Sequence, residues 1–485
     1  MPSYEELLQQ NASLKFENAQ LKRLIFSSKK ESHRPVETPL EQGNLFDLEP
    51  TSTEEQVTTQ AISYERKKPS SHKGRNKLPS HLPVKEVVIE PEVDTSEMNK
   101  IGEEVTDTLE YTPGSLVIIR TRRIKYVTKK NIAKQGSQEN DQRIYIAPAP
   151  QRAINKCIAE SSLLAHIIVR KFIDHLPFYR QIQGFKRDFN WQPSKSTIND
   201  WFIAVCTLLQ PLYNELGKEL LISKYIQADE SPIKVQDKNK SGKTHQGYQW
   251  VYHSPGKRIV LFKYHKSRSH HAVKEILQDY QGWVQCDGYK AYDKLLKYNK
   301  NIKLAGCWVH ARRKYYEAKD SDAQRSNYAL DIFTKVYHHE AVSKTYQAID
   351  RKAYRNRHVV PLINELYNWI SEESIKVLPK SPLGRAMNYS IRQKGKLMAC
   401  FEDGAIELDN NLIENKIRPL ALGRKNYLFA GSHAAAQRIA MMYSFFATCK
   451  ANEVNPQHWL TYVLDNIKET KLTKLRSLFP QNVQL

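Results

Sequence analysis

The chain has 485 residues, a formal net charge of +22 and a pI of about 9.5, so it exceeds one ordinary domain and favours a polyanionic partner. It contains no apolar run long enough for a transmembrane helix and no signal-peptide pattern at its start, and its six cysteines are scattered without a CxxC pair. These features predict a cytosolic protein with reduced thiols whose partner is DNA or RNA, and no membrane association.

The first predicted elements are a coiled-coil helix over residues 1–35 and a disordered basic linker over residues 36–80. Leucine and asparagine each recur at seven-residue spacing near the start: Leu7, Leu14, Leu21, Asn11 and Asn18. This pattern is typical of a short parallel dimer in which asparagine sets the register, although an amphipathic helix packed on its own chain has the same spacing. The basic end of the linker is compatible with a phosphate backbone contact or with a solvated connection.

A β-rich module is predicted over residues 81–150 and a helical region over residues 151–220. Alternating apolar residues predict strands at 84–89, 107–111 and 115–120, and arginines and lysines from 120 onward make the module basic. In the helical region, a serine- and threonine-rich start predicts a helix from Ser194 to about Leu209, ending before Pro211. Short helices of this kind suit DNA binding, but packing without DNA contact fits the pattern equally well.

Strands and helices then alternate over residues 221–319. The expected strands are 222–229, 247–253, 258–264, 283–287 and 302–307, an antiparallel hairpin followed by parallel-type units. Residues 320–395 are predicted to be helical, without a strand signal. The α/β pattern returns over residues 396–450, with a short strand at 427–429, and residues 451–485 form a helical tail.

Three carboxylates stand out in this pattern. Tyr225 to Asp229 and Trp283 to Asp287 both read aromatic-x-Gln-x-Asp, so strand alternation places the aromatic ring, the glutamine and the aspartate on one face. Glu414 lies in a predicted helix that begins at 409–410 and stops at Pro419. Each acid alone is compatible with a turn or a surface position.

Together, three acids in a very basic chain predict a metal site that acts on phosphates. Hard ions such as Mg²⁺ prefer oxygen ligands, and two such ions activate the nucleophile and stabilise the leaving oxygen of a phosphodiester. We therefore expect Asp229, Asp287 and Glu414 to be catalytic metal ligands for two Mg²⁺ ions, with Mn²⁺ able to substitute.

Basic residues near the acids are expected to contact DNA phosphates. Arg418 lies one helical turn after Glu414, and Arg424 and Lys425 follow it, although a surface ion pair and a turn would produce the same pattern. His310 follows Cys307 at short spacing but has no second ligand pair, so we expect a packed side chain or a substrate contact rather than a zinc ligand. The expected DNA contacts are His310, Arg312, Arg313, Arg418, Arg424 and Lys425. Glu230 points to the opposite strand face and is left out of the predicted site.

At these residues the chain resembles the transposases of the IS66 insertion-sequence family, which are DDE enzymes with an RNase H-like core. The most specific segments of the resemblance are residues 228–232, 286–292, 307–314 and 410–432. The resemblance implies that Asp229, Asp287 and Glu414 are the DDE triad and that the helical stretch 320–395 interrupts the core. It also implies binding of terminal inverted repeats, nicking at the 3′ ends and strand transfer into target DNA.

Two alternatives to this function remain open: a catalytically silent DNA-binding regulator derived from a transposase, and an RNase H-like nuclease without strand transfer. We expect a homodimer or higher oligomer formed through the coiled coil, a place on the bacterial nucleoid, and possible accessory proteins of the same element. Many IS66-like proteins carry a zinc-binding cysteine cluster near 83–130, but this chain has no cysteine before Cys157. We therefore expect no zinc in the β module.

Overall fold

The computed structural model describes residues 78, 80–96, 98–112, 114–128, 144–237 and 243–483. The chain divides into two units, Met1–Gly74 and Arg75–Leu485, and the first lies wholly outside the described residues. The predicted coiled coil over 1–35 and nearly all of the predicted linker over 36–80 therefore lie outside them too. No helix among the described residues is long and apolar enough to span a membrane.

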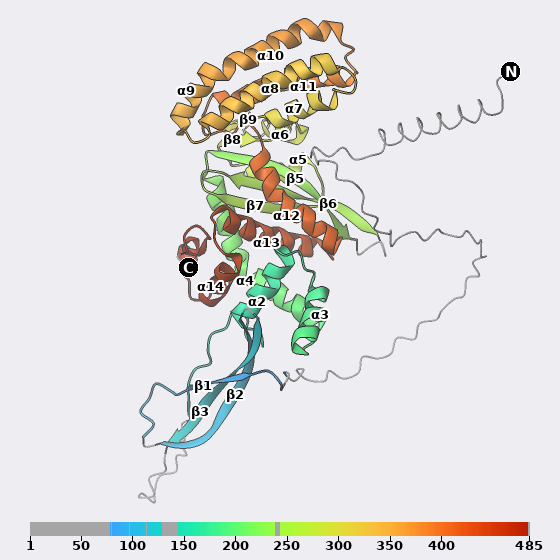
Figure 1. Cartoon of the computed structure of the whole chain (residues 1–485). Helices are drawn as coiled ribbons and strands as arrows, with labels where there is room; N and C mark the ends of the chain where they lie inside the picture. Colours follow the sequence, from blue (N-terminus) through green and yellow to red (C-terminus); the bar gives the residue numbers. More distant parts are fainter. Residues whose placement is uncertain are drawn as a thin grey trace, which may run out of the picture. The chain divides into compact units, whose positions relative to one another are not determined.

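The β module is a small sheet built on one long hairpin (Figure 1). Its strands are β1 Val84–Ile89, β2 Met98–Thr112, β3 Ser115–Thr128 and β4 Ile144–Ile146. β2 and β3 are antiparallel, β1 runs parallel to β3, and β4 pairs with β3 beyond the end of β1. All three predicted strands are present, and the two hairpin strands are longer than the alternating pattern indicated.

Arginines of β3 that made this module look basic are engaged by carboxylates across the sheet. Arg120 Nε lies 3.1 Å from Asp107 Oδ1, and Arg122 Nη2 lies 2.8 Å from Glu86 Oε1. Arg123 forms a further pair with a glutamate of β2. Because these charges are already paired, the sheet offers DNA less free positive charge than its sequence suggests.

We expect the β module to fold without zinc. The described residues from 80 to 146 contain no cysteine and a single histidine, His81, whose Nε2 contacts the carbonyl of Phe189. Purified protein should contain no stoichiometric zinc by elemental analysis, and EDTA should leave its thermal unfolding unchanged. Zinc that copurifies at one ion per chain, and whose removal unfolds this sheet, would contradict the expectation.

The helical region after the module contains α2 Ser161–Phe172, α3 Phe178–Phe189 and α4 Lys195–Leu221. Ser194 caps α4 by accepting a hydrogen bond from the Thr197 N–H, as the sequence predicts. The predicted stop before Pro211 is wrong, because α4 continues through it. Leu209, Leu212 and Leu216 are fully buried around the proline, and their burial offsets the cost of roughly 3 kcal/mol that a proline imposes inside a helix.

A five-stranded mixed sheet forms the centre of the remaining chain. Its strands, in the spatial order β7-β6-β5-β8-β9, are β5 Tyr225–Gln236, β6 Thr244–Ser254, β7 Ile259–His265, β8 Gly282–Gln285 and β9 Ile302–Ala305. The first three strands are antiparallel, and β8 and β9 continue the sheet in parallel with β5. This order confirms the prediction of an antiparallel hairpin followed by parallel units.

Helices that lie between the strands in sequence, and helices that follow the last strand, complete this core. α5 His270–Leu277 and α6 Lys290–Leu295 connect strands, α7 Trp308–Glu317 follows the last strand β9, and α12 Asn411–Tyr427 and α13 His433–Ala451 pack on the antiparallel strands. α14 Pro456–Asn466 and the 3₁₀ helix η3 Leu472–Leu478 end the described chain. Figure 1 shows α12 and α13 lying across β5, β6 and β7.

Two predictions for α12 are wrong. The helix does not stop at Pro419, because Ile413 and Leu420 on either side of the proline are fully buried and hold the helix on the sheet. No strand forms at 427–429. Instead, α12 runs to Tyr427, and a single bridge pairs Val235 with Ala430.

The residues from 320 to 398 are helical, as predicted, and their buried side chains form a second hydrophobic core together with side chains of α7, β5 and β9. Their helices are α8 Ala323–Ser343, α9 Ala348–His358, α10 Val360–Glu373, η1 Ser374–Lys376 and α11 Pro382–Met398, followed by η2 Ala399–Phe401. Trp308 of α7 is buried in this core, and its indole N–H donates to the Leu397 carbonyl at 2.9 Å. We call residues 320–395 the helical insertion.

Candidate active site

Asp229 and Asp287 are placed by two neighbouring parallel strands. β5 and β8 pair so that their aromatic residues lie opposite each other and Gln227 lies opposite Gln285. Each aspartate follows its glutamine by two residues, so the two repeats are aligned residue for residue. The sequence predicts that Asp229 ends its strand, and this prediction is wrong. β5 continues to Gln236 by pairing with β6.

Glu414 lies in the first turn of α12, and the start of that helix is tied to the sheet. Asn410, directly before the helix, is fully buried. Its backbone N–H donates to Cys307 Sγ, and its side-chain amide donates to the Ala228 carbonyl, both at 3.3 Å. Glu414 Oε1 lies 4.0 Å from His310 Nε2. The start of the Glu414 helix is therefore held against β5 directly beside Asp229.

The charges of the other two acids act on the pKa of Asp229. Burial, together with the charges of Glu230, Asp287 and Glu414 and against a lowering by the Glu230 N–H, raises the pKa of Asp229 to about 8. Burial also lowers the pKa of His310, although the charges of Asp287 and Glu414 oppose that shift. A site with this much negative charge is stabilised by a bound cation.

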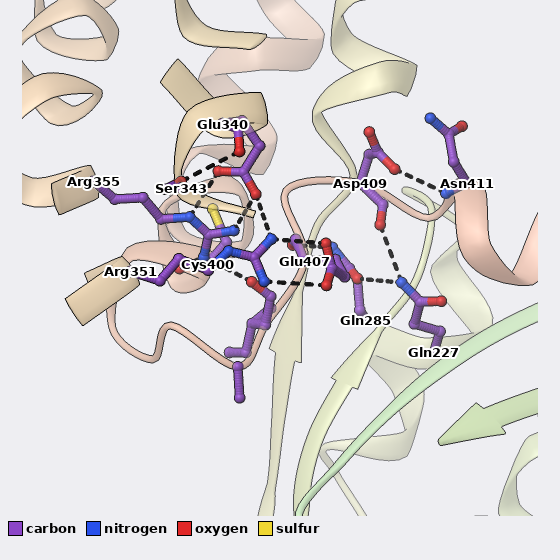
Figure 2. Close-up of polar contacts among 12 residues, drawn as sticks. Gln227, Gln285, Glu340, Ser343, Arg351, Arg355, Cys400, Glu407, Asp409 and Asn411 are labelled. Atoms are coloured by element: carbon purple, nitrogen blue, oxygen red, sulfur yellow. Dashed lines mark hydrogen bonds and ion pairs between the residues drawn. The ribbon is translucent and has the colours of Figure 1, made fainter. Parts of the chain in front are cut away.

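The segment from Glu407 to Asn410 is held by the paired glutamines (Figure 2). We call this segment the linker from here on; it is distinct from the predicted basic linker over residues 36–80. Gln227 Nε2 donates to the Asp409 carbonyl at 3.0 Å, and Gln285 Nε2 donates to the Glu407 carbonyl at 2.7 Å. The Tyr225 hydroxyl accepts from the Glu407 N–H and donates to Gln285 Oε1. The face shared by the aromatic residue and glutamine of β5 thus holds the chain that leads to Glu414.

Arg355 anchors the same segment from inside the helical insertion. Its side chain is fully buried, and its Nε and Nη2 atoms donate to Glu340 at 2.8 and 2.5 Å. Its Nη1 atom donates to the carbonyls of Cys400 at 3.0 Å and Ile406 at 2.7 Å. The guanidinium therefore joins α8 and α9 to the residue directly before the linker.

Arg351, one helical turn earlier, adds a second connection. It lies between the carboxylates of Glu340 and Glu407, and its Nη2 atom is 2.8 Å from Glu407 Oε2. Figure 2 shows the two arginines and two glutamates as one network that continues through Glu407 to Gln285 on β8. The helical insertion and the sheet therefore hold the linker from opposite sides.

His253 lies behind the glutamine network and makes stability depend on pH. It is 4% exposed, its Nδ1 lies 3.4 Å from Gln227 Oε1, and burial, together with the charge of Lys416, lowers its pKa to about 3. The unfolded histidine takes up a proton near its ordinary pKa of about 6.5, and the folded one does not, so acidification favours unfolding.

We expect His253→Gln to weaken this pH dependence. Between pH 6.5 and 4.5 the wild-type histidine removes up to about 1.4 kcal/mol of unfolding free energy per pH unit, and the variant lacks this contribution. Urea unfolding at several pH values measures the slope. An unchanged slope in the variant would show that His253 is protonated in the folded protein.

The expected DNA contacts differ in their surroundings. His310 and Arg313 line a cavity beside Asp287, and Arg418 and Lys425 are exposed on α12. The guanidinium of Arg424, however, donates to the Pro232 carbonyl on β5. It has a structural partner that the sequence did not suggest. Arg312 lies half-buried on α7.

The sequence did not indicate that Glu230 contributes to the electrostatics of Asp229. Its carboxylate lies on the other side of β5 and pairs with Arg268 at 2.5 Å, and only 3% of its side chain is exposed. It is nevertheless a charge that raises the pKa of Asp229. The adjacency of Asp229 and Glu230 was the available signal, because neighbouring carboxylates interact even when they face opposite sides of a strand.

The donor chemistry of Asp229, Asp287 and Glu414 fits a hard divalent cation, since carboxylate oxygens are its preferred ligands. Burial and the neighbouring charges favour the protonated form of Asp229, whereas a nearby cation would favour the ionised carboxylate. Within the described ranges, no group of three or more His, Cys, Asp or Glu side chains is arranged closely enough to hold a metal ion by itself.

These features define a multidomain α/β protein with an acidic site on a mixed sheet, in a strongly basic chain. The chain belongs to the IS66 family of transposases: the family model described as "Transposase IS66 family" matches residues 156–438. A model of the IS66 C-terminal element matches residues 444–481. A third, described as "Transposase C of IS166 homeodomain", matches residues 13–87, most of which lie outside the described part of the chain.

Similar proteins occur in Sinorhizobium fredii. The uncharacterized protein y4jD is 28% identical over 99% of this chain and 96% of its own length. The uncharacterized protein y4qI is 30% identical over 84% of this chain and 77% of its own. The similarity to y4jD thus extends over almost the whole of both chains.

Proposed function

We propose that this protein is a DNA transposase that binds the terminal inverted repeats of its insertion sequence, nicks the DNA at the 3′ ends and joins those ends to target DNA. The observation that supports the proposal is the placement of the three acids: β5 and β8 pair in register ahead of Asp229 and Asp287, Asn410 at the start of the Glu414 helix donates to the Ala228 carbonyl, and the charges of Asp287 and Glu414 both raise the pKa of Asp229. Membership of the IS66 family supports the same reaction.

The proposed catalytic core is RNase H-like and is interrupted by the helical insertion. Three antiparallel strands followed by two parallel ones, with the insertion before the helix that carries Glu414, support this assignment. The acids then come from the central strand, the loop directly after its parallel neighbour β8, and the helix that follows the insertion. We propose domains with the boundaries expected from the sequence: 1–35, 36–80, 81–150, 151–220, 221–319, 320–395, 396–450 and 451–485.

Asp229, Asp287 and Glu414 would hold two Mg²⁺ ions, or Mn²⁺ in their place. Bound there, the ions would activate the attacking oxygen and stabilise the leaving one. The three carboxylates would act as ligands and not as proton carriers. His310, 4.0 Å from Glu414, and Arg313 would orient the phosphate that is cleaved.

Binding to the terminal repeats would involve the N-terminal part of the chain as well. The match of residues 13–87 to a homeodomain model supports DNA binding there, and this segment overlaps the coiled coil over 1–35 that would form a homodimer or higher oligomer. We propose that the protein acts in the bacterial cytoplasm, on the nucleoid, with accessory proteins of the same element as further partners.

An in vitro reaction with Mg²⁺ or Mn²⁺ tests the function. The substrates are duplexes that carry the element's terminal repeat, intact or already nicked at the 3′ end, and a supercoiled target plasmid. Joined product supports a transposase. Cleavage without joining would identify a nuclease, and binding without either reaction would identify a silent regulator.

A further inference from the structure

A cavity of about 340 Å³ lies directly beside Asp287. The residues that give it chemical character are Asp287, Tyr289, His310, Arg313, Lys314 and Tyr389. They come from the loop after β8, from α7 and from α11 of the helical insertion. The cavity is therefore assembled from both parts of the protein, and one of the proposed metal ligands forms its edge.

One face of α7 lines the cavity with side chains whose charge changes along the helix. His310, Arg313, Lys314 and Glu317 are spaced by three and four residues, so they follow one another along a single side of the helix. His310 lies at the end near Glu414, the two cations are in the middle, and the carboxylate of Glu317 is at the far end. Such a wall attracts one phosphate near the site and repels a second phosphate farther away.

Two tyrosines supply the aromatic surface of the cavity. Tyr289 is fixed, because its backbone N–H donates to Asp287 Oδ1 at 2.9 Å and its hydroxyl donates to the Arg268 carbonyl at 2.5 Å. Tyr389 is half-buried, and Lys314 Nζ lies 4.9 Å from the centre of its ring. An ammonium group beside an aromatic ring can pair with a phosphate while the ring contacts a base.

The absence of a side chain at Gly288 allows Tyr389 to approach the aspartate loop. A Cβ atom at Gly288 would lie 3.0 Å from Cε2 and 3.2 Å from the hydroxyl of Tyr389. Any larger residue there would displace the ring. The contact between the core and the helical insertion thus sets the shape of the cavity next to Asp287.

We propose that this cavity binds one unpaired nucleotide of the DNA end beside the cleaved bond, with its phosphate at Arg313 and Lys314 and its base against the ring of Tyr389. The volume lies at the lower end of small-ligand sites, which span about 300–1,000 Å³, so it suits a single nucleotide and excludes a duplex. A base can enter such a cavity only after leaving the stack. The inference rests on the proposed transposase function.

The test couples a protein change to a DNA change. Full-length wild type and Tyr389→Ala bind duplexes of the terminal repeat in which one nucleotide at a time, on either side of the cleavage point, is replaced by an abasic residue. At one position the wild type should lose about tenfold in affinity, and Tyr389→Ala should be insensitive to the change. Tyr389→Phe, which keeps the ring, should behave as the wild type does.

Tyr316→Ala is the matched control, because this tyrosine lies on α7, is 39% exposed and does not line the cavity. It should keep the wild-type sensitivity to the abasic position. Gly288→Ala, which displaces the ring, should reduce that sensitivity. Abasic effects that are the same in the wild type and Tyr389→Ala at every position would overturn the inference.

Cleavage measured on the same unmodified duplexes separates this inference from the proposed function. A wild type that cleaves the repeat but has no coupled position keeps its function without the nucleotide site. A coupled position in a wild type that never cleaves supports the nucleotide site and counts against the transposase.

Discussion

Replacing any one of the three acids is expected to abolish strand cleavage and leave DNA binding intact. Asp229→Ala, Asp287→Ala and Glu414→Gln each remove a proposed metal ligand, and the loss of a single charge-stabilising group at a reaction centre costs at least about 10²–10³-fold in rate. Cleavage of a labelled terminal-repeat duplex measures the rate, and a gel-shift assay on the same duplex measures binding.

The same variants should respond differently to metal. In the wild type, Mg²⁺ should raise the unfolding temperature, because a ligand that binds only the folded state stabilises it. Each variant should show a smaller shift. Glu402→Gln is a suitable control, since Glu402 is exposed and lies outside the site. Cleavage at the wild-type rate by any triad variant would remove that residue from the catalytic site.

Replacing Arg355 is expected to produce the largest loss of stability. Arg355→Met leaves Glu340 with one guanidinium instead of two and leaves the carbonyls of Cys400 and Ile406 without their donor. Breaking a buried ion pair from one side costs about 3–5 kcal/mol. Because Ile406 directly precedes the linker, cleavage should fall as well. Urea unfolding and the cleavage assay measure the two effects.

A double replacement separates charge from packing at this network. Arg355→Met with Glu340→Gln removes the Arg355–Glu340 pair and leaves Arg351 paired with Glu407 alone, so the double variant should lose less stability than the sum of the two single variants. Arg357→Met, an exposed arginine on the same helix, should change stability by less than about 0.5 kcal/mol. If Arg355→Met proved as stable as the control, the network would not hold the linker.

These two predictions address different parts of one arrangement. The triad variants test the carboxylates themselves, whereas Arg355→Met tests how the helical insertion holds the chain that leads to Glu414. Mn²⁺ offers a further distinction, because it can rescue a loosely held site by binding more tightly than Mg²⁺. Rescue of Arg355→Met, but not of Asp229→Ala, would identify Arg355 as a positioning residue.

The sequence by itself predicted the features that depend on local geometry. Strand alternation put the aromatic residue and the glutamine of each repeat on one face, and the hydrogen bonds of Tyr225 and Gln227 to Gln285 confirm it. The Ser194 cap, the hairpin that precedes the parallel strands and the helical character of 320–395 were also predictable. Each follows from backbone periods and capping preferences within a few residues.

Only the tertiary structure decided whether helices continue through their prolines and which charges already have partners. It also decided how the helix that carries Glu414 is placed relative to Asp229 and Asp287. α4 and α12 continue through Pro211 and Pro419 because buried neighbours outweigh the local cost. Arg120 and Arg122 of β3 pair with carboxylates on neighbouring strands, and Arg424 donates to the Pro232 carbonyl, 192 residues away in sequence. Glu414 is separated from Asp287 by the helical insertion, and its position results from long-range hydrogen bonds and ion pairs. Such contacts depend on how distant segments pack, which no local pattern encodes.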